Sequence, residues 1–146
     1  MGAPVQGAVD VRGVNKSFPR HQGGGDLRVL NDVTFSIDAG TFICLVGPSG
    51  CGKSTLLRII DGLIPPDAGE VHIGGERVRG PSLDRGFVFQ QFNLLPWRTV
   101  IGNVEFGLEN MGVRKQERRR RALEVIKLVD LEGFESSYPS QLSGGM

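Results

Sequence analysis

The sequence is short of cysteine, of net charge and of long apolar runs, and each shortage excludes a class of protein. Cys44 and Cys51 are the only cysteines, which is too few for a disulfide framework, so we expect free thiols in a reducing compartment. A net charge of +1, from 17 basic and 16 acidic residues, gives no general attraction to nucleic acid or anionic lipid. No apolar run approaches the roughly 20 residues that span a bilayer, and no signal-peptide pattern is present. We therefore expect a cytosolic protein.

Glycine is abundant, with 22 residues in 146, and one glycine-rich stretch organises the prediction. Residues 47–55 match the phosphate-loop pattern G-x-x-x-x-G-K-[ST] at every fixed position. Glycines let backbone N–H groups surround a polyphosphate, Lys53 adds positive charge at the β- and γ-phosphates, and Ser54 offers a hydroxyl to Mg²⁺. A turn that only caps a helix needs neither of these side chains. The predicted nucleotide-binding residues are Gly47, Pro48, Ser49, Gly50, Cys51, Gly52, Lys53, Ser54 and Thr55.

The flanking residues supply the strand and the helix that a phosphate loop requires. Residues 42–46 form an unbroken apolar run, typical of a buried parallel strand, and residues 56–60 continue as a helix. Alternating apolar and polar residues predict antiparallel strands at 9–18 and 29–37, joined by a turn at 21–26.

After the loop helix, Gly62 and two prolines turn the chain. Further along, the predicted secondary structure changes from strands to helices. A hairpin is expected around Gly74 and Gly75, and a short strand at 86–89. Helices are expected at 99–111, interrupted by glycines, and at 115–130. The second helix has an apolar stripe of Ala122, Val125, Ile126 and Val129, preceded by four arginines, 118–121, which we expect to form a solvated face.

Three motifs in order identify a family. The phosphate loop is followed by Phe89-Gln90-Gln91 with Leu94-Leu95-Pro96-Trp97, and then by Leu142-Ser143-Gly144-Gly145-Met146. With these motifs the chain resembles the ATP-binding subunit of ABC transporters over essentially its whole length. The resemblance implies an α/β fold, a P-loop NTPase of ABC type with an antiparallel β subdomain and the start of a helical subdomain. The implied domains are 1–95, the nucleotide-binding core, and 96–146, the helical subdomain.

The resemblance also implies roles for residues outside the loop. Phe18 is similar to the aromatic residue that stacks on adenine, although an ordinary core aromatic at a strand end remains an alternative. Gln90 would reach Mg²⁺ and the attacking water, so Lys53 and Gln90 are the implied catalytic residues, whereas a plain polar strand end is the alternative for Gln90. Ser143, Gly144 and Gly145 would contact the γ-phosphate held by a second ATP-binding subunit in a head-to-tail dimer, and would otherwise form an unremarkable turn.

Partners follow from the same resemblance. Phe92, Leu94, Leu95 and Trp97 lie where a cytoplasmic helix of a transmembrane permease subunit would dock, or else they fill the core of the helical subdomain. The subunit would sit on the cytoplasmic face of the membrane and meet a substrate-binding protein only indirectly. The sequence Leu95-Pro96-Trp97 and Met146 are similar to the corresponding residues in ATP-binding subunits of nitrate, sulfonate or taurine importers. A nucleotide-binding module without turnover, or an ABC-type ATPase acting on nucleic acid or ribosomes, are the alternatives.

The chain departs from the family after its signature motif. The family continues with a Walker B aspartate, a catalytic glutamate and a switch histidine, and none of these follows Met146. Residues 125–130 are not a Walker B strand, because Lys127 interrupts the apolar run, and His21 and His72 come too early for the switch. We expect a truncated subunit that binds Mg-ATP without hydrolysing it, with one side of the 42–46 strand exposed.

Overall fold

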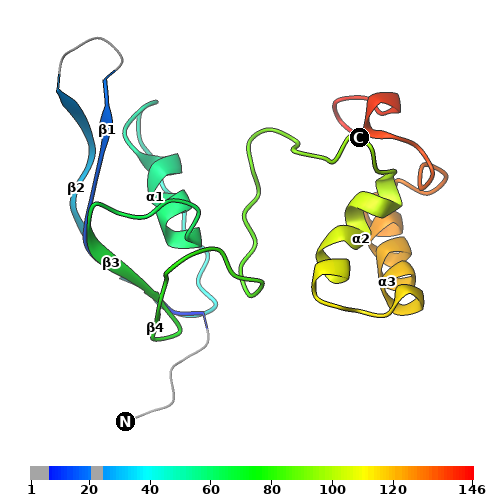
Figure 1. Cartoon of the computed structure of the whole chain (residues 1–146), viewed down its shortest axis with the longest axis horizontal. Helices are drawn as coiled ribbons and strands as arrows, with labels where there is room; N and C mark the ends of the chain where they lie inside the picture. The colour runs from blue at the N-terminus through cyan, green and yellow to red at the C-terminus, as the bar shows by residue number, and fades with distance from the viewer. Residues whose placement is uncertain (1–6, 21–24) are drawn as a thin grey trace. The chain divides into compact units, whose positions relative to one another are not determined.

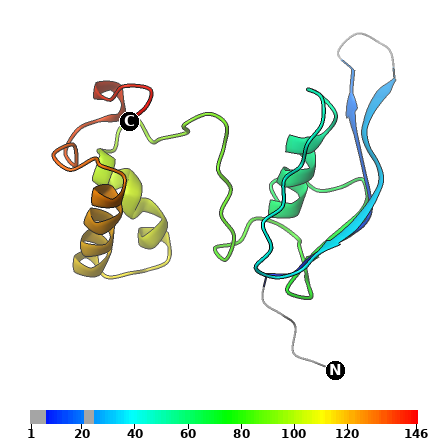
Figure 2. The same ribbon diagram turned by 180° about the vertical axis from the view of Figure 1, so that it is seen from behind.

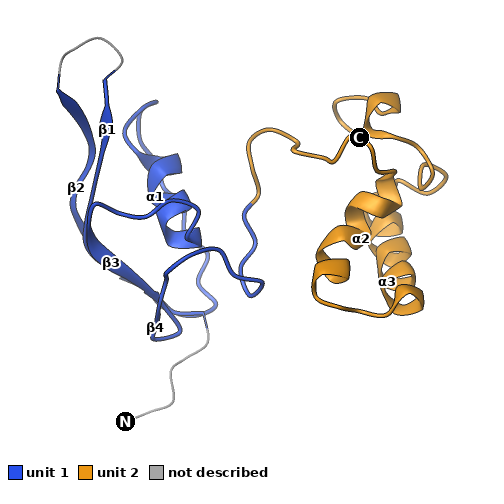
Figure 3. Ribbon diagram, in the orientation of Figure 1, with its two compact units in different colours: residues 1–87 blue, residues 88–146 orange. Residues whose placement is uncertain are grey.

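The chain forms two compact units, which are coloured separately in Figure 3. This computed structural model describes residues 7–20 and 25–146. His21 and most of the expected turn at 21–26 therefore lie outside the described residues. Unit 1 runs from Met1 to Phe87 and unit 2 from Val88 to Met146. The domain limits drawn from the resemblance, 1–95 and 96–146, remain a prediction. No helix in the described ranges is long and apolar enough to cross a membrane.

Unit 1 contains a four-stranded antiparallel sheet with β1 near its centre (Figure 1). Its strands are β1 (Val9–Pro19), β2 (Asp26–Ile37), β3 (Ala68–Ile73) and β4 (Glu76–Arg77), in the order β2-β1-β3-β4. Val9 pairs with Ile37 of β2 on one side and with Ile73 of β3 on the other. The predicted antiparallel pair and the hairpin at Gly74 and Gly75 are confirmed.

The helix α1 (Lys53–Asp61) packs on one face of this sheet (Figures 1 and 2). Leu56 and Ile59, three residues apart, place their side chains on one side of the helix, and both are buried. They join Val11, Val14, Leu30 and Val71 in the apolar core of unit 1. The helix ends at Gly62, as predicted, with a left-handed φ of 85°, where a Cβ would overlap the Gly80 carbonyl.

Two predicted strands do not form. Residues 42–46 have no strand assignment and are exposed, with Phe42 at 89% and Val46 at 93% of their full accessibility. An extended segment becomes a strand only when a neighbour accepts and donates its backbone hydrogen bonds. The sheet of the described residues is wholly antiparallel and does not include this segment. Residues 86–89 likewise form no strand. Cys44 is consequently exposed instead of buried, and both cysteines are free.

Unit 2 consists mainly of two packed helices, α2 (Val100–Asn110) and α3 (Lys115–Leu128), followed by a short 3₁₀ helix (Pro139–Gln141). Thr99 caps α2 by accepting a hydrogen bond from the Gly102 N–H at 3.4 Å. The helix predicted at 99–111 is confirmed, but its glycines do not interrupt it. The core of the unit is small, formed by Val100, Ile101, Ala122 and Ile126.

The predicted stripe of α3 is half right. Ala122 and Ile126 are buried, whereas Val125 and Val129 are 49% and 57% exposed. The neighbouring arginines divide in the same way. Arg120 and Arg121 are exposed and pair with Glu117 on their own helix, as expected of a solvated face. Arg118 is turned toward α2, where it pairs with Glu105 at 3.7 Å, so the prediction was wrong for this residue.

Candidate nucleotide-binding and partner-binding site

The loop before α1 has the backbone shape that its glycines predict. Gly50 and Gly52 have φ angles of 82° and 97°, in the left-handed region that side chains disfavour. A Cβ on Gly52 would lie 2.8 Å from Leu30 Cδ2 and 3.0 Å from the Val29 carbonyl oxygen. A Cβ on Gly47 would lie 2.9 Å from Cys51 Sγ. The loop is therefore held against β2 at Gly52, where the positive φ and the Val29 backbone favour glycine, and is folded closely on itself between Gly47 and Cys51.

The start of α1 is electrostatically suited to an anion. No side chain caps this helix, and no acidic residue lies in its first turn. The first N–H groups and the positive end of the helix dipole therefore face outward without a built-in negative partner. Residues 47–51 are exposed and Gly52 is buried, so the loop offers its backbone to solvent while one glycine anchors it.

Lys53 completes this cradle. Its Nζ donates to the Gly47 and Pro48 carbonyl oxygens, each at 2.7 Å, and lies 3.6 Å from Cys51 Sγ. The ammonium is thus held over the loop by exposed carbonyl groups, which it can exchange for phosphate oxygens. The combination of glycine backbone, uncapped helix and adjacent lysine fits a polyphosphate, as the sequence predicts.

The fit to Mg²⁺ depends on the phosphates. Ser54 is exposed in the first turn of α1, where its hydroxyl can act as a single oxygen ligand. Among the residues that the structure describes, no cluster of three or more His, Cys, Asp or Glu side chains could hold a metal alone. Coordination of Mg²⁺ by Ser54 and Gln90 remains a prediction.

Phe18 lies near the end of β1 and is 38% exposed, outside the apolar core of unit 1. This exposure argues against the alternative that Phe18 is an ordinary core aromatic. The Lys16 ammonium lies 5.7 Å from the ring centroid, so one face of the ring is near a cation. The end of β1 and the loop before α1 lie at the same end of unit 1 (Figures 1 and 2). Stacking of Phe18 on adenine remains a prediction.

The other two predicted motifs lie in unit 2. Gln90 is exposed in a bend, and Ser143, Gly144 and Gly145 are exposed in a turn closed by the Met146 N–H donating to Ser143 O at 3.0 Å. The segment after Gln90 and the signature residues line one groove of about 470 Å³. Its lining residues are Gln91, Phe92, Asn93, Leu94, Pro139, Leu142, Ser143, Gly144, Gly145 and Met146. The roles of Gln90 and of the signature residues toward nucleotide remain predictions.

The apolar residues after Gln90 are mostly outside the core of unit 2. Phe92, Leu94 and Trp97 are 78%, 46% and 72% exposed, while Leu95 is half-buried. The structure therefore favours a surface role over the core-filling alternative for these three residues. Sequence reasoning missed the polar residues that fix this segment, Arg98 and Asn103. Their only signal was Asn103 in the first turn of a predicted helix, a residue type that helix propensity disfavours.

A glycine loop that delivers a lysine to the start of a helix places the chain among the P-loop NTPases. Residues 30–146 match the family described as ABC transporter, and the chain belongs to this family. It also superposes on the dimeric ATP-binding cassette MJ0796, solved in a post-hydrolysis state with ADP and Pi, with a TM-score of 0.81 and 38% identity. That match covers 93% of this chain and 63% of the solved chain. The predicted fold class is thereby confirmed.

The curated relatives are ATP-binding proteins of ABC transporters. An uncharacterised one from Methanocaldococcus jannaschii is 53% identical over 123 residues, covering 84% of this chain and 46% of the relative. The nitrate import ATP-binding protein NrtD of Synechocystis is 48% identical, with the same 84% and 46% covered. The taurine import ATP-binding protein TauB of Yersinia pestis is 50% identical, covering 80% and 46%. The chain spans about half the length of these relatives.

Proposed function

We propose that these residues are the ATP-binding and signature-bearing part of a subunit that couples ATP to solute import by an ABC transporter. The observation that carries the proposal is the loop at residues 47–53, where Lys53 Nζ sits 2.7 Å from two loop carbonyls at the start of an uncapped helix. This arrangement is suited to binding the phosphates of a nucleotide. A loop that only capped the helix would not require Lys53.

In this proposal the residues of unit 1 bind and orient Mg-ATP. Backbone N–H groups of the loop and the start of α1 donate to the phosphates, Lys53 offsets their charge, and Ser54 contributes one oxygen to Mg²⁺. Phe18 supports the adenine ring. The predicted site residues include no Asp or Glu that could act as a general base, so we expect the 146 residues alone to bind ATP without turnover.

The proposed partners use the exposed surface of unit 2. A second ATP-binding subunit would meet Ser143, Gly144 and Gly145, whose backbone is open to solvent. The dimeric state of the similar solved cassette supports this pairing. Membrane subunits would dock on the exposed side chains of Phe92, Leu94 and Trp97, which places the protein at the cytoplasmic face of the membrane. A substrate-binding protein would act only through those subunits.

The proposed solute is a small anion such as nitrate, a sulfonate or taurine. Support comes from the relatives named for nitrate and taurine import, which are 48% and 50% identical to this chain. Uptake of labelled nitrate and taurine, in a host that lacks its own ATP-binding subunit and carries the gene for this protein, tests this choice. Uptake of neither anion would contradict it.

Titration with Mg-ATP tests the nucleotide assignment itself. We expect the full 146-residue chain to bind saturably by calorimetry, and Lys53→Ala to weaken binding at least tenfold, since one charge-assisted contact to phosphate is lost. Lys127→Ala is the matched control, because this lysine lies on α3 with its Nζ 3.6 Å from Glu132. Equal affinity in all three proteins would overturn the proposal.

A further inference from the structure

Trp97 is displayed on a tight turn. The Arg98 N–H donates to the Leu95 carbonyl oxygen at 3.0 Å, which closes a four-residue turn with Pro96 at its second position and Trp97 at its third. Proline fixes the backbone at that second position. The indole is 72% exposed, so its own packing does not hold this turn in place.

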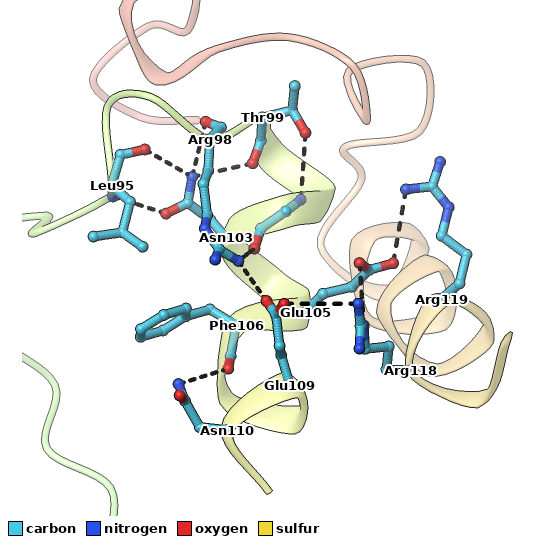
Figure 4. Close-up of polar contacts among 11 residues, drawn as sticks. Leu95, Arg98, Thr99, Asn103, Glu105, Phe106, Glu109, Asn110, Arg118 and Arg119 are labelled. Carbon is cyan, nitrogen blue, oxygen red and sulfur yellow. Dashed lines mark hydrogen bonds and ion pairs between the residues drawn. The ribbon is translucent and has the colours of Figure 1, made fainter. Parts of the chain in front are cut away.

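The turn is held by Asn103, which lies on the first turn of α2 (Figure 4). Its Oδ1 accepts from the Leu95 N–H at 2.8 Å. Its Nδ2 faces three carbonyl oxygens, those of Leu95 at 3.2 Å, Arg98 at 3.1 Å and Thr99 at 3.0 Å. An amide nitrogen has two hydrogens, so these three acceptors share them. One carboxamide thus satisfies both ends of the turn that carries Trp97.

Arg98 supplies a second attachment between the turn and α2. Its Nη1 donates to Glu109 Oε2 at 2.6 Å, and its guanidinium carbon lies 5.0 Å from the centre of the Phe106 ring. Glu109 Oε1 in turn lies 3.8 Å from the Arg118 guanidinium of α3. The turn is therefore fastened to the helix by side chains from both directions.

Asn110 on the same helix provides a contrast. Its Nδ2 donates to the Phe106 carbonyl oxygen at 2.9 Å, one turn back along α2, and it makes no contact with the 95–99 segment in Figure 4. The same residue type on the same helix therefore has a purely local role. Of these two asparagines, Asn103 bonds to the turn and Asn110 bonds to its own helix.

We propose that Asn103 is a positioning residue, which holds the Leu95–Arg98 turn so that Trp97 is presented to the membrane subunit in a fixed backbone geometry. This inference rests on the proposed function for its docking partner. A segment that is ordered before docking loses little conformational entropy on binding, so its exposed aromatic contributes more of its burial to affinity. Loosening the turn should therefore weaken docking while the indole itself remains present.

Backbone order in the whole chain provides the first test. We expect the ¹⁵N order parameter of the Trp97 amide to be near 0.85 in the wild type and below about 0.6 in Asn103→Ala and Asn103→Asp. The aspartate keeps an acceptor for the Leu95 N–H but replaces the amide donors with an oxygen that faces three carbonyls. Asn110→Ala should leave the order parameter unchanged. A mobile Trp97 amide in the wild type, or an equally ordered one in a folded Asn103 variant, overturns the proposal.

Docking provides the second test. The whole chain, with or without each substitution, is titrated onto purified transmembrane subunits of an ABC importer. We expect Asn103→Ala and Asn103→Asp to raise Kd about tenfold, Trp97→Ala to raise it at least as much, and Asn110→Ala to leave it unchanged, with equal melting temperatures confirming that unit 2 stays folded. Binding that depends on Trp97 but not on Asn103 overturns the positioning role alone. Absent binding, or binding indifferent to Trp97, overturns the proposed docking surface instead.

Discussion

The two units hold their candidate sites by different means. In unit 1 the phosphate loop is anchored by apolar contact, since Gly52 packs against the side chain of the buried Leu30. In unit 2 the exposed turn is anchored by polar groups, chiefly the carboxamide of Asn103 and the guanidinium of Arg98. Apolar burial is nondirectional, whereas hydrogen bonds and ion pairs fix direction, and the ion pairs also respond to pH and, where exposed, to salt.

The size of the two cores explains this difference. Unit 1 buries six apolar residues in its core cluster, and unit 2 buries four. Unit 2 also buries Glu105, whose Oε2 and Oε1 lie 3.7 Å from Arg118 and Arg119 respectively. Glu105 Oε1 and Arg118 Nε are buried without a hydrogen-bond partner. The smaller unit therefore relies on charge pairing across its helices, which a larger apolar core would make unnecessary.

Removing one core side chain from each unit is the strongest way to break the comparison. Ile59 and Ile126 are each 1% exposed, so Ile59→Ala and Ile126→Ala should each cost about 2–5 kcal/mol of unfolding free energy. Hydrogen exchange should show the loss confined to the unit that carries the substitution. Leu128→Ala, at 82% exposure, is the control and should change stability by less than about 0.5 kcal/mol. Equal loss of protection in both units would contradict separate cores.

Gly52→Ala tests how unit 1 anchors the loop. The new Cβ would meet Leu30 and would require a left-handed alanine, so we expect a loss of about 2–3 kcal/mol together with weaker ATP binding. Gly40→Ala isolates the backbone contribution, because Gly40 has a φ of 73° and open space around its Cβ position. Its expected cost is about 1 kcal/mol. Equal melting temperatures for the two variants would show that the Leu30 contact is unimportant.

Glu105→Gln tests how unit 2 depends on charge. The substitution removes the Glu105 carboxylate from Arg119 and leaves Arg118 only Glu109 as a partner, so we expect a loss of about 1–3 kcal/mol, measured by urea unfolding at low and high salt. Because the Glu105 side chain is only 11% exposed, added salt should change this difference from the wild type little. Glu132→Gln is the control, because Glu132 and its partner Lys127 are both exposed, and its effect should stay below about 0.5 kcal/mol.

The smallest expected effect is a dependence of α3 on acid. Hydrogen bonds from Arg120 and Arg121 lower the pKa of Glu117 from 4.5 to about 2. Because the folded pKa is the lower one, the stabilisation is fully present above pH 4.5 and is lost as the pH falls toward 2. Glu117→Gln should reduce the pH dependence of the thermal midpoint of unit 2 between pH 4.5 and 2. Glu132→Gln should leave that pH dependence unchanged. If the thermal midpoint of Glu117→Gln varies with pH as in the wild type, these ion pairs do not stabilise unit 2.

The phosphate loop, its helix and the antiparallel strands were all predictable from local patterns. The exposure of Val125 and Val129 was not, because the small apolar core of unit 2 buries only Ala122 and Ile126 among the apolar residues of the predicted stripe. The brace at Asn103 was not predictable either. An asparagine inside a helix gives no sign of which backbone groups it reaches, since these depend on how the preceding turn folds.

Local residue patterns in the sequence determined which segments turn, which form helices and where a triphosphate can bind. Glycine, proline and the fixed order of Gly52, Lys53 and Ser54 act over a few residues and need no distant partner. Tertiary contact alone decided that residues 42–46 stay unpaired in the described residues and that a carboxamide supports Trp97. A strand, or a hydrogen bond from a side chain to distant backbone, forms only when a second backbone segment lies beside it, and the tertiary fold decides whether one does.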